Sequence, residues 1–209
     1  MKRRGKIKNL LFDMGGVIVD LDRNRCLQAL LDIGLEDADN LIGLYIQDGV
    51  FADLEAGRIS AADFRAEVHK DLPLEVTDEQ LDAAFSSFIV DIPRHRLKCL
   101  RQLRKRYGVY LLSNTNPIMY DGILAELFKQ EGLTVDDYFD GITLSYKAGC
   151  SKPYRGIFDY AVETMGIVPE ETLFLDDGPD NIEAARQLGF NALLVPPGTE
   201  FEDLLKTHL

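Results

Sequence analysis

The stretch NLLFDMGGVIVDLD, residues 9–22, ends an apolar run on Asp13 and then places two glycines in the chain. The apolar residues before Asp13 are typical of a short buried strand, and we expect one over residues 7–12. Gly15 and Gly16 allow a tight turn and let backbone groups approach a ligand closely. An aspartate at the end of a strand, followed by exposed backbone, therefore indicates a ligand site.

The segment from about residue 23 to residue 105 has the spacing of amphipathic helices. The sequences SAAD at 60–63 and TDEQ at 77–80 resemble capping boxes and predict two helix starts. Pro93 predicts the start of a helix rich in Arg and Lys, which we expect Gly108 to end. This part of the chain is therefore predicted to be helical.

Beyond Gly108, short apolar runs alternate with helical patterns. We expect strands at 109–113, 141–145, 172–176 and 191–195, and helices at about 118–130, 155–165 and 181–188. Strands that alternate with helices predict a three-layer, Rossmann-like α/β core with a parallel sheet. The predicted division is a core of residues 1–20 and 93–209, with a helical cap of residues 21–92 inserted after the first strand.

Composition excludes several classes of protein. The 209-residue chain carries a net charge of −12, which repels nucleic-acid phosphates, so no nucleic-acid partner is expected. No run reaches the roughly 18 apolar residues of a membrane span, and Asp13 interrupts an N-terminus that superficially resembles a signal peptide. The three cysteines form no CxxC pair, which fits a reducing compartment. We therefore predict a cytoplasmic protein with no membrane partner.

Carboxylates follow the first and the fourth predicted strands, at Asp13 and at Asp176-Asp177. Parallel strands bring their carboxyl ends to one edge of the sheet, where ligands bind. Clustered carboxylates raise one another's pKa unless a cation joins them, and oxygen ligands favour Mg²⁺. The sequence therefore predicts a magnesium site at this edge.

Groups suited to phosphate converge on the same edge. Ser113 and Asn114 end the second strand, and Lys152 precedes a helix. The Ser113 hydroxyl and the Lys152 ammonium suit phosphoryl oxygens. A carboxylate in line with phosphorus, as we expect of Asp13, is a good nucleophile for an aspartyl-phosphate intermediate.

Four motifs in this order, FDMGGV, LLSNTN, SKPYRGIF and FLDDGPDNIEAARQLG, run from residue 12 to residue 189. Together they resemble the haloacid dehalogenase-like hydrolase superfamily. The forms DMGGVIVDLD and DDGPDNI are most similar to the bacterial α-glucose-1-phosphatase branch and to the phosphatase domain of soluble epoxide hydrolases.

This resemblance implies a role for each matching residue. Asp13 would be the nucleophile and a metal ligand, and Gly15 would offer its carbonyl oxygen to the metal. The remaining roles are the following: Ser113 and Asn114 hold the phosphoryl group, Lys152 neutralises it, Asp177 binds the metal with Asp176 close by, and Asn181 or Asp180 lies in the outer shell.

Gly15 departs from the family pattern, because most phosphatases of the family have an acid–base Asp at this position. Loss of a proton shuttle reduces a rate by roughly 10²–10⁴-fold. The glucose-1-phosphatase-like branch also has glycine there, so we predict a Mg²⁺-dependent phosphatase for a small phosphate monoester such as a sugar phosphate. The alternatives are a metal-independent 2-haloacid dehalogenase and a non-catalytic phosphosugar-binding protein.

Residues of the predicted cap could reach the substrate. The segment VFADLEAGRIS, residues 50–60, offers Phe51, Glu55 and Arg58 to a cleft between cap and core, although helix packing and surface charge explain them better. Asp20 and Asp22, at the entry to the cap, are either solvated or in contact with substrate.

Overall fold

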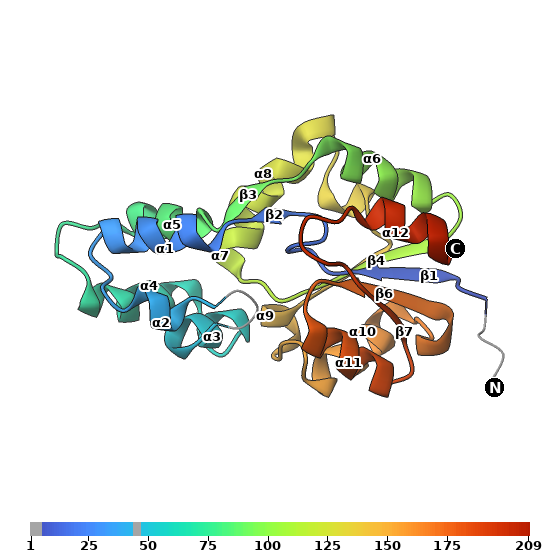
Figure 1. Ribbon diagram of the computed structural model, residues 1–209. Helices are drawn as coiled ribbons and strands as arrows, with labels where there is room; N and C mark the ends of the chain where they lie inside the picture. The colour runs from blue at the N-terminus through green and yellow to red at the C-terminus, as the bar shows by residue number, and fades with distance from the viewer. Residues whose placement is uncertain (1–5, 44–46) are drawn as a thin grey trace.

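In the computed structural model, residues 6–43 and 47–209 are described, and these ranges contain an α/β core with a helical extension at one end (Figure 1). The first five residues of the predicted core and residues 44–46 of the predicted cap lie outside the described residues. Within the described ranges, no helix is both long and apolar enough to cross a membrane.

The core sheet is parallel throughout and, in the described part of the chain, has five strands in the order β5-β4-β1-β6-β7. The strands are β1 (Asn9–Phe12), β4 (Gly108–Ser113), β5 (Gly141–Leu144), β6 (Thr172–Asp176) and β7 (Asn191–Leu194). The central position of β1 places the residue that follows it, Asp13, in the middle of the edge where the strands end. The predicted parallel α/β fold is thus confirmed.

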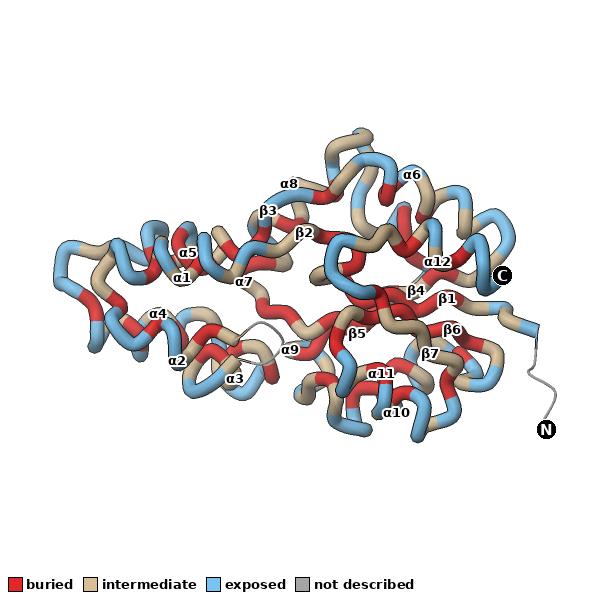
Figure 2. The backbone as a smooth tube through the Cα atoms, in the orientation of Figure 1, coloured by how far each residue is buried: buried red, intermediate tan, exposed pale blue. Residues whose placement is uncertain are grey.

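Helices cover both faces of this sheet (Figure 1). The helices α6 (Arg94–Leu103), α8 (Ala125–Phe128) and α12 (Phe201–His208) lie on one face, and α10 (Arg155–Met165) and α11 (Pro179–Gln187) lie on the other. Leu10 and Phe12 of β1 belong to the apolar cluster on the first face, whereas Leu11 belongs to the cluster on the second. Successive strand residues point to opposite faces, which explains why β1 is a continuous apolar run. Figure 2 shows the central strands β1, β4 and β6 as mostly buried, whereas the edge strand β7 is half-buried.

Between β1 and β4 the chain forms the helical extension. Its helices are α1 (Arg23–Asp32), α2 (Ala38–Leu41), α3 (Gly49–Glu55), α4 (Ala61–Val68), η1 (His69–Asp71) and α5 (Asp78–Ser86). Ser60 and Thr77 both form complete capping boxes, so these two predicted helix starts are confirmed. The aromatic rings of Phe51, Phe64 and Phe85 pack together inside the extension, with centroid distances of 4.9–5.6 Å.

The extension leaves and re-enters the core through one antiparallel ribbon. The strands β2 (Asp20–Leu21) and β3 (Ile89–Asp91) pair with each other, and the Asp22 amide donates to the Phe88 carbonyl oxygen at 2.9 Å. The division into core and cap at residues 20/21 and 92/93 remains a prediction, and we propose that this ribbon forms the junction.

The remaining short elements connect core strands to helices. They are α7 (Pro117–Met119), the π-helical η2 (Tyr120–Leu124), η3 (Lys129–Glu131), η4 (Val135–Asp137), α9 (Ser145–Ala148) and η5 (Pro169–Glu171). The expectation that Gly108 ends the basic helix was wrong. That helix, α6, ends at Leu103, and Gly108 is the first residue of β4.

Arg96 of α6 joins three parts of the core near the predicted site. Its guanidinium donates to both carboxylate oxygens of Glu200 at 2.9 Å, to Asp20 at 2.7 Å and to the Ile18 carbonyl oxygen at 3.2 Å. Asp20 is therefore an ion-pair partner in β2 and does not line the cleft, and Asp22 caps α1 by accepting from the Arg25 amide. Arg96 thus fixes the chain that follows the Asp13 loop.

Glu200→Gln is expected to lower the Tm by about 2–4 °C at pH 6 and to have little effect near pH 2. Hydrogen bonds from Arg96 lower the pKa of Glu200 to about 2. The stabilisation by this carboxylate is therefore present above the unfolded value of about 4.5 and is lost as the pH falls through the folded value. Thermal unfolding followed by circular dichroism from pH 2 to pH 7 measures it. Asp203→Asn, which removes an exposed ion pair with Lys206, is the control and should change the Tm little at any pH.

Candidate active site

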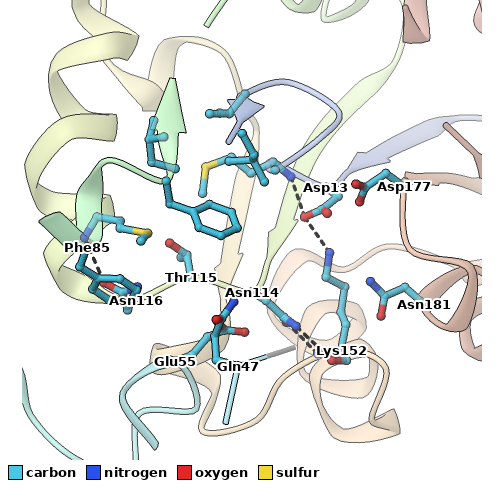
Figure 3. Close-up of a pocket in the computed structure, with 17 residues that line it drawn as sticks. Asp13, Gln47, Glu55, Phe85, Asn114, Thr115, Asn116, Lys152, Asp177 and Asn181 are labelled. Carbon is cyan, nitrogen blue, oxygen red and sulfur yellow. Dashed lines mark hydrogen bonds and ion pairs between the residues drawn. The ribbon is translucent and has the colours of Figure 1, made fainter. Parts of the chain in front are cut away.

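Asp13 lies at the floor of a cleft between the sheet edge and the helical extension (Figure 3). It directly follows β1, and its amide donates to the Leu175 carbonyl oxygen of β6 at 2.8 Å. One carboxylate oxygen, Oδ1, accepts from the Met14 amide at 2.7 Å and lies 2.7 Å from Lys152 Nζ. Among the described residues no hydrogen bond reaches the other oxygen, Oδ2, so this oxygen is available to a ligand.

Lys152 is held between two carboxylates. Its Nζ lies 2.7 Å from Asp13 Oδ1 and 2.6 Å from Asp176 Oδ2, and the residue is 2% exposed. Burial alone would lower the pKa of Lys152, but the two carboxylates more than offset this and keep it above its usual value. Lys152 is therefore a permanently charged ammonium on the floor of the cleft.

Three carboxylates surround this single ammonium. Asp13, Asp176 and Asp177 each offer an oxygen, and these oxygens lie within 4.8 Å of one another. Burial raises the pKa of Asp13 well above its usual value, and burial followed by the charge of Asp176 raises the pKa of Asp177 to about 6. The excess negative charge and the all-oxygen donor set fit a hard divalent cation such as Mg²⁺.

Asp176 is more deeply engaged than the other two carboxylates. Its Oδ2 accepts from Lys152, and its Oδ1 accepts from the Gly178 amide at 2.7 Å and from Asn181 Nδ2 at 2.9 Å. Asp177 and Asn181 line the cleft, whereas Asp176 is completely buried and Asp180 is exposed. Of the two predicted outer-shell residues, Asn181 is therefore the one that lies at the site.

Asn114 binds the backbone of the lysine loop. Its Nδ2 donates to the Lys152 carbonyl oxygen at 3.0 Å, and its Oδ1 accepts from the Lys152 amide at 2.8 Å. Asn114 lines the cleft, and these two bonds leave one N–H of its amide available to a ligand. Ser113 is buried, its hydroxyl donates to the Asn114 carbonyl oxygen at 3.1 Å, and it is not one of the residues that line the cleft. The structure thus gives Asn114 a role in positioning Lys152 that the sequence did not indicate.

The two glycines after Asp13 have different constraints. Gly15 lines the cleft, and a Cβ there would lie 2.8 Å from Leu21 Cδ1, so Leu21 fills the space that a side chain at position 15 would enter. Gly16 has a φ of +68°, and a Cβ there would lie 2.2 Å from Asp177 Oδ2. Glycine at position 16 therefore allows the nucleophile loop and the Asp177 carboxylate to approach each other.

The wall of the cleft opposite the sheet comes from the helical extension and from the residues after β4. It is mainly apolar, with polar groups at intervals: the apolar members include Leu21, Phe85, Phe88 and Met119, and the polar members include Gln47, Glu55, Thr115 and Asn116. Of the three cap residues singled out in the sequence, only Glu55 lines this wall. Phe51 is fully buried, and Arg58 pairs with Asp53 at 2.6 Å.

Thr115 and Asn116 were not identified from the sequence as site residues. They are the last two residues of the LLSNTN motif, directly after Asn114, and their membership of that motif is the signal that could have identified them. Asn116 also caps α7, since its Oδ1 accepts from the Met119 amide at 3.0 Å.

Comparison with known proteins finds relatives that match this chain over almost its full length. The chain is 40% identical over 203 residues to the D-ribitol-5-phosphate phosphatase of Bacteroides thetaiotaomicron, covering 97% of this chain and 98% of the relative. A wild-type family enzyme from the same organism, crystallised with magnesium and inorganic phosphate, superposes with a TM-score of 0.89 at 40% identity over 95% of this chain and 98% of its own.

A more distant relative belongs to the branch indicated by the motifs. Bifunctional epoxide hydrolase 2 of Mus musculus is 30% identical over 104 residues, which is 50% of this chain and 19% of that protein. The family model described as haloacid dehalogenase-like hydrolase matches residues 7–189. This chain therefore belongs to the haloacid dehalogenase-like hydrolase family.

Proposed function

We propose that this phosphoric monoester hydrolase, whose cofactor is Mg²⁺, removes phosphate from a small sugar phosphate or sugar-alcohol phosphate through an aspartyl-phosphate on Asp13. The observation that carries the proposal is the pairing of Asp13 with Lys152 at 2.7 Å, beside Asp177, on the floor of a cleft. A nucleophile and a cation for the phosphoryl group are thereby brought together.

The metal would be held by the Asp13 and Asp177 carboxylates and by the Gly15 carbonyl oxygen. Both oxygens of Asp176 already accept bonds from Lys152 or from the Gly178 loop. We therefore assign Asp176 to holding Lys152 and not to direct ligation. When bound, Mg²⁺ supplies positive charge that offsets the charge of the phosphoryl oxygens.

In the first half-reaction the free Asp13 oxygen attacks phosphorus, and the bond from phosphorus to the alcohol oxygen breaks. In the second half-reaction a water oxygen bonds to phosphorus, and the bond from phosphorus to Asp13 breaks, which restores the carboxylate. Throughout, Lys152 carries a positive charge beside the transferring group, and Asn114 keeps the Lys152 backbone in place.

The residues that line the cleft support a small substrate. Polar side chains between Leu21, Phe85 and Met119 suit a leaving group that has a short carbon chain bearing hydroxyls. The D-ribitol-5-phosphate phosphatase that shares 40% of residues with this chain supports a substrate of this class.

The test is release of inorganic phosphate from a panel of sugar and sugar-alcohol phosphates and from 4-nitrophenyl phosphate, with Mg²⁺ and with EDTA. We expect release that requires Mg²⁺ and that is fastest with one of the sugar or sugar-alcohol phosphates. Chloride release from a 2-chloroacid without metal would instead indicate a dehalogenase. Binding of a phosphosugar with no release would indicate a sensor.

Gly16→Ala is expected to raise the Mg²⁺ concentration needed for half-maximal phosphate release by about tenfold or more. A Cβ at position 16 would lie 2.2 Å from Asp177 Oδ2, so it would displace the Asp177 carboxylate. The measurement is a Mg²⁺ titration of phosphate release.

Gly132→Ala is the matched control for this substitution. Gly132 also has a left-handed φ, +73°, but no atom lies within 4 Å of its Cβ position. Both substitutions introduce backbone strain, so both should lower the Tm, and only Gly16→Ala should change the Mg²⁺ dependence. Equal Mg²⁺ curves for the two variants would contradict the placement of the metal beside Asp177.

A further inference from the structure

The loop after the nucleophile, Met14-Gly15-Gly16, has no side chain that could give a proton to the leaving alcohol. Position 15, two residues after the nucleophile, is a glycine, and the side chain of Leu21 fills the space in front of it. An alkoxide is a poor leaving group, so hydrolysis of a sugar phosphate requires a proton at the departing oxygen. A donor must then come from another part of the cleft.

Glu55 enters the same cleft from the opposite side. In Figure 3 it points in from the helical extension together with Gln47, while Asp13 and Asp177 enter from the core. Glu55 also lines the adjoining groove with Asn114 and Lys152. Among residues 6–43 and 47–209, no hydrogen bond or ion pair to its carboxyl group is found, so the group is available to a ligand.

The backbone around Glu55 is held firmly against the core. Glu55 is the last residue of α3, whose Phe51 and Leu54 are completely buried. Two residues later, Gly57 presses against α9: a Cβ at position 57 would lie 2.1 Å from the Tyr146 carbonyl oxygen. The carboxyl group is therefore presented by a packed helix end and not by a free surface loop.

From this geometry we infer that Glu55 is the acid–base residue of the reaction, and this inference rests on the proposed function. The Glu55 carboxylic acid donates its proton to the alcohol oxygen as the bond from that oxygen to phosphorus breaks. The resulting Glu55 carboxylate accepts a proton from the water that attacks the aspartyl-phosphate, and the cycle returns Glu55 to the acid form. The products are the alcohol and inorganic phosphate.

The ionisation of Glu55 fits this task. Burial raises its pKa to about 7, although the positive charge of Lys152 lowers it somewhat. A carboxyl group that ionises near the working pH can both give and take a proton. Asp13 and Asp177 share its cleft, and Arg58 shares the adjoining groove.

The other charged groups on the helices that pack against α3 have contacts of their own. These contacts are Asp39 with Arg23, Asp63 with Ser60, Arg65 with Asp82, Glu67 with Lys70, and Lys147 over the Tyr120 ring. Lys152 is accordingly the cation that faces Glu55.

The experiment compares two esters, D-ribitol 5-phosphate and 4-nitrophenyl phosphate, whose nitrophenolate leaves without a proton. Glu55→Gln should lower kcat/KM for D-ribitol 5-phosphate by about 10²-fold and for 4-nitrophenyl phosphate by less than about threefold. The second readout is the ratio of kcat/KM for D-ribitol 5-phosphate to kcat/KM for 4-nitrophenyl phosphate. In the wild type this ratio should fall as the pH rises through about 7, because Glu55 loses its proton. In Glu55→Gln the ratio should not fall. Glu55→Asp, which retains a carboxyl group, should still show the fall with pH.

Glu75→Gln, an exposed position of the helical extension, is the control and should change neither ester nor the pH profile. Equal losses for both esters, an unchanged pH profile, or a higher KM with unchanged kcat would overturn the assignment. If Glu55→Gln has a lower Tm, the pH profile of Glu55→Asp decides the question alone. A different result would contradict the proposed function itself: phosphate release by Asp13→Asn.

Discussion

Asp13→Asn should reduce Mg²⁺-dependent phosphate release by at least about 10⁴-fold. The substitution keeps the shape of the side chain, and its carbonyl oxygen can still accept from the Met14 amide, a bond of 2.7 Å in the wild type. It removes the free carboxylate oxygen that attacks phosphorus, and an amide does not form an acyl phosphate. Lys152 keeps its bond of 2.6 Å to Asp176, so the fold should persist.

Two measurements separate loss of the nucleophile from loss of the structure. Phosphate release gives the rate, and acid quenching with ³²P-labelled substrate should leave label on the wild type and none on the variant. Burial raises the pKa of Asp13, which means that the ionised carboxylate is costly to bury. Because Asn is neutral, thermal unfolding of the variant should show no loss of stability. Asp180→Asn, at an exposed position outside the cleft, is the matched control. Retention of more than a tenth of the wild-type rate by Asp13→Asn would refute covalent catalysis by this residue.

Lys152→Met is the other substitution with a large expected effect, and it should impair both turnover and stability. The ammonium is 2% exposed and lies 2.6–2.7 Å from two carboxylates. Removal of one partner from such a buried cluster costs about 3–5 kcal/mol, because the remaining charges are left uncompensated. Loss of a preorganised donor to the transferring phosphoryl group costs about 10²–10³-fold in kcat.

Urea unfolding and steady-state kinetics with the best substrate of the phosphate-ester panel measure the two effects of Lys152→Met. Lys147→Met is a suitable control, since Lys147 is exposed and its ammonium lies over the Tyr120 and Tyr146 rings outside the site. We expect the control to unfold and to turn over almost as the wild type does. A Lys152→Met protein of normal stability and normal kcat would show that the ion pairs with Asp13 and Asp176 have neither role.

Local patterns were sufficient to predict most of the fold. The apolar runs that became β1, β4 and β6 are buried on both faces, so their composition alone identifies them. The capping boxes at Ser60 and Thr77 are also local signals. The ribbon strands β2 and β3 are two and three residues long, too short for a periodic pattern, and their pairing joins positions far apart in the chain.

The site residues that directly follow a strand could be predicted from the sequence, whereas the roles of the other site residues could be predicted less well. Asp13 and Asp177 follow β1 and β6 directly, so their convergence follows from the parallel sheet. The amide of Asn114, by contrast, binds the backbone of Lys152, 38 positions away in sequence. Glu55 was offered to the cleft together with Phe51 and Arg58, and residue type and spacing do not tell which of the three reaches it; that depends on contacts between distant segments, such as the packing of α3 against α9.

The ribbon of β2 and β3 joins the helical extension to the core, so the extension is one continuous insertion in the chain. The chain leaves after Leu21 and returns at Ile89, and these two residues are directly paired. Because closing a loop costs little more free energy when the loop is longer, the segment between them can lengthen, shorten or be exchanged without altering the spacing of the strand ends. The extension can therefore change over evolution while Asp13 and Asp177 keep their places at the strand ends, provided that α3 still presents Glu55 to the cleft.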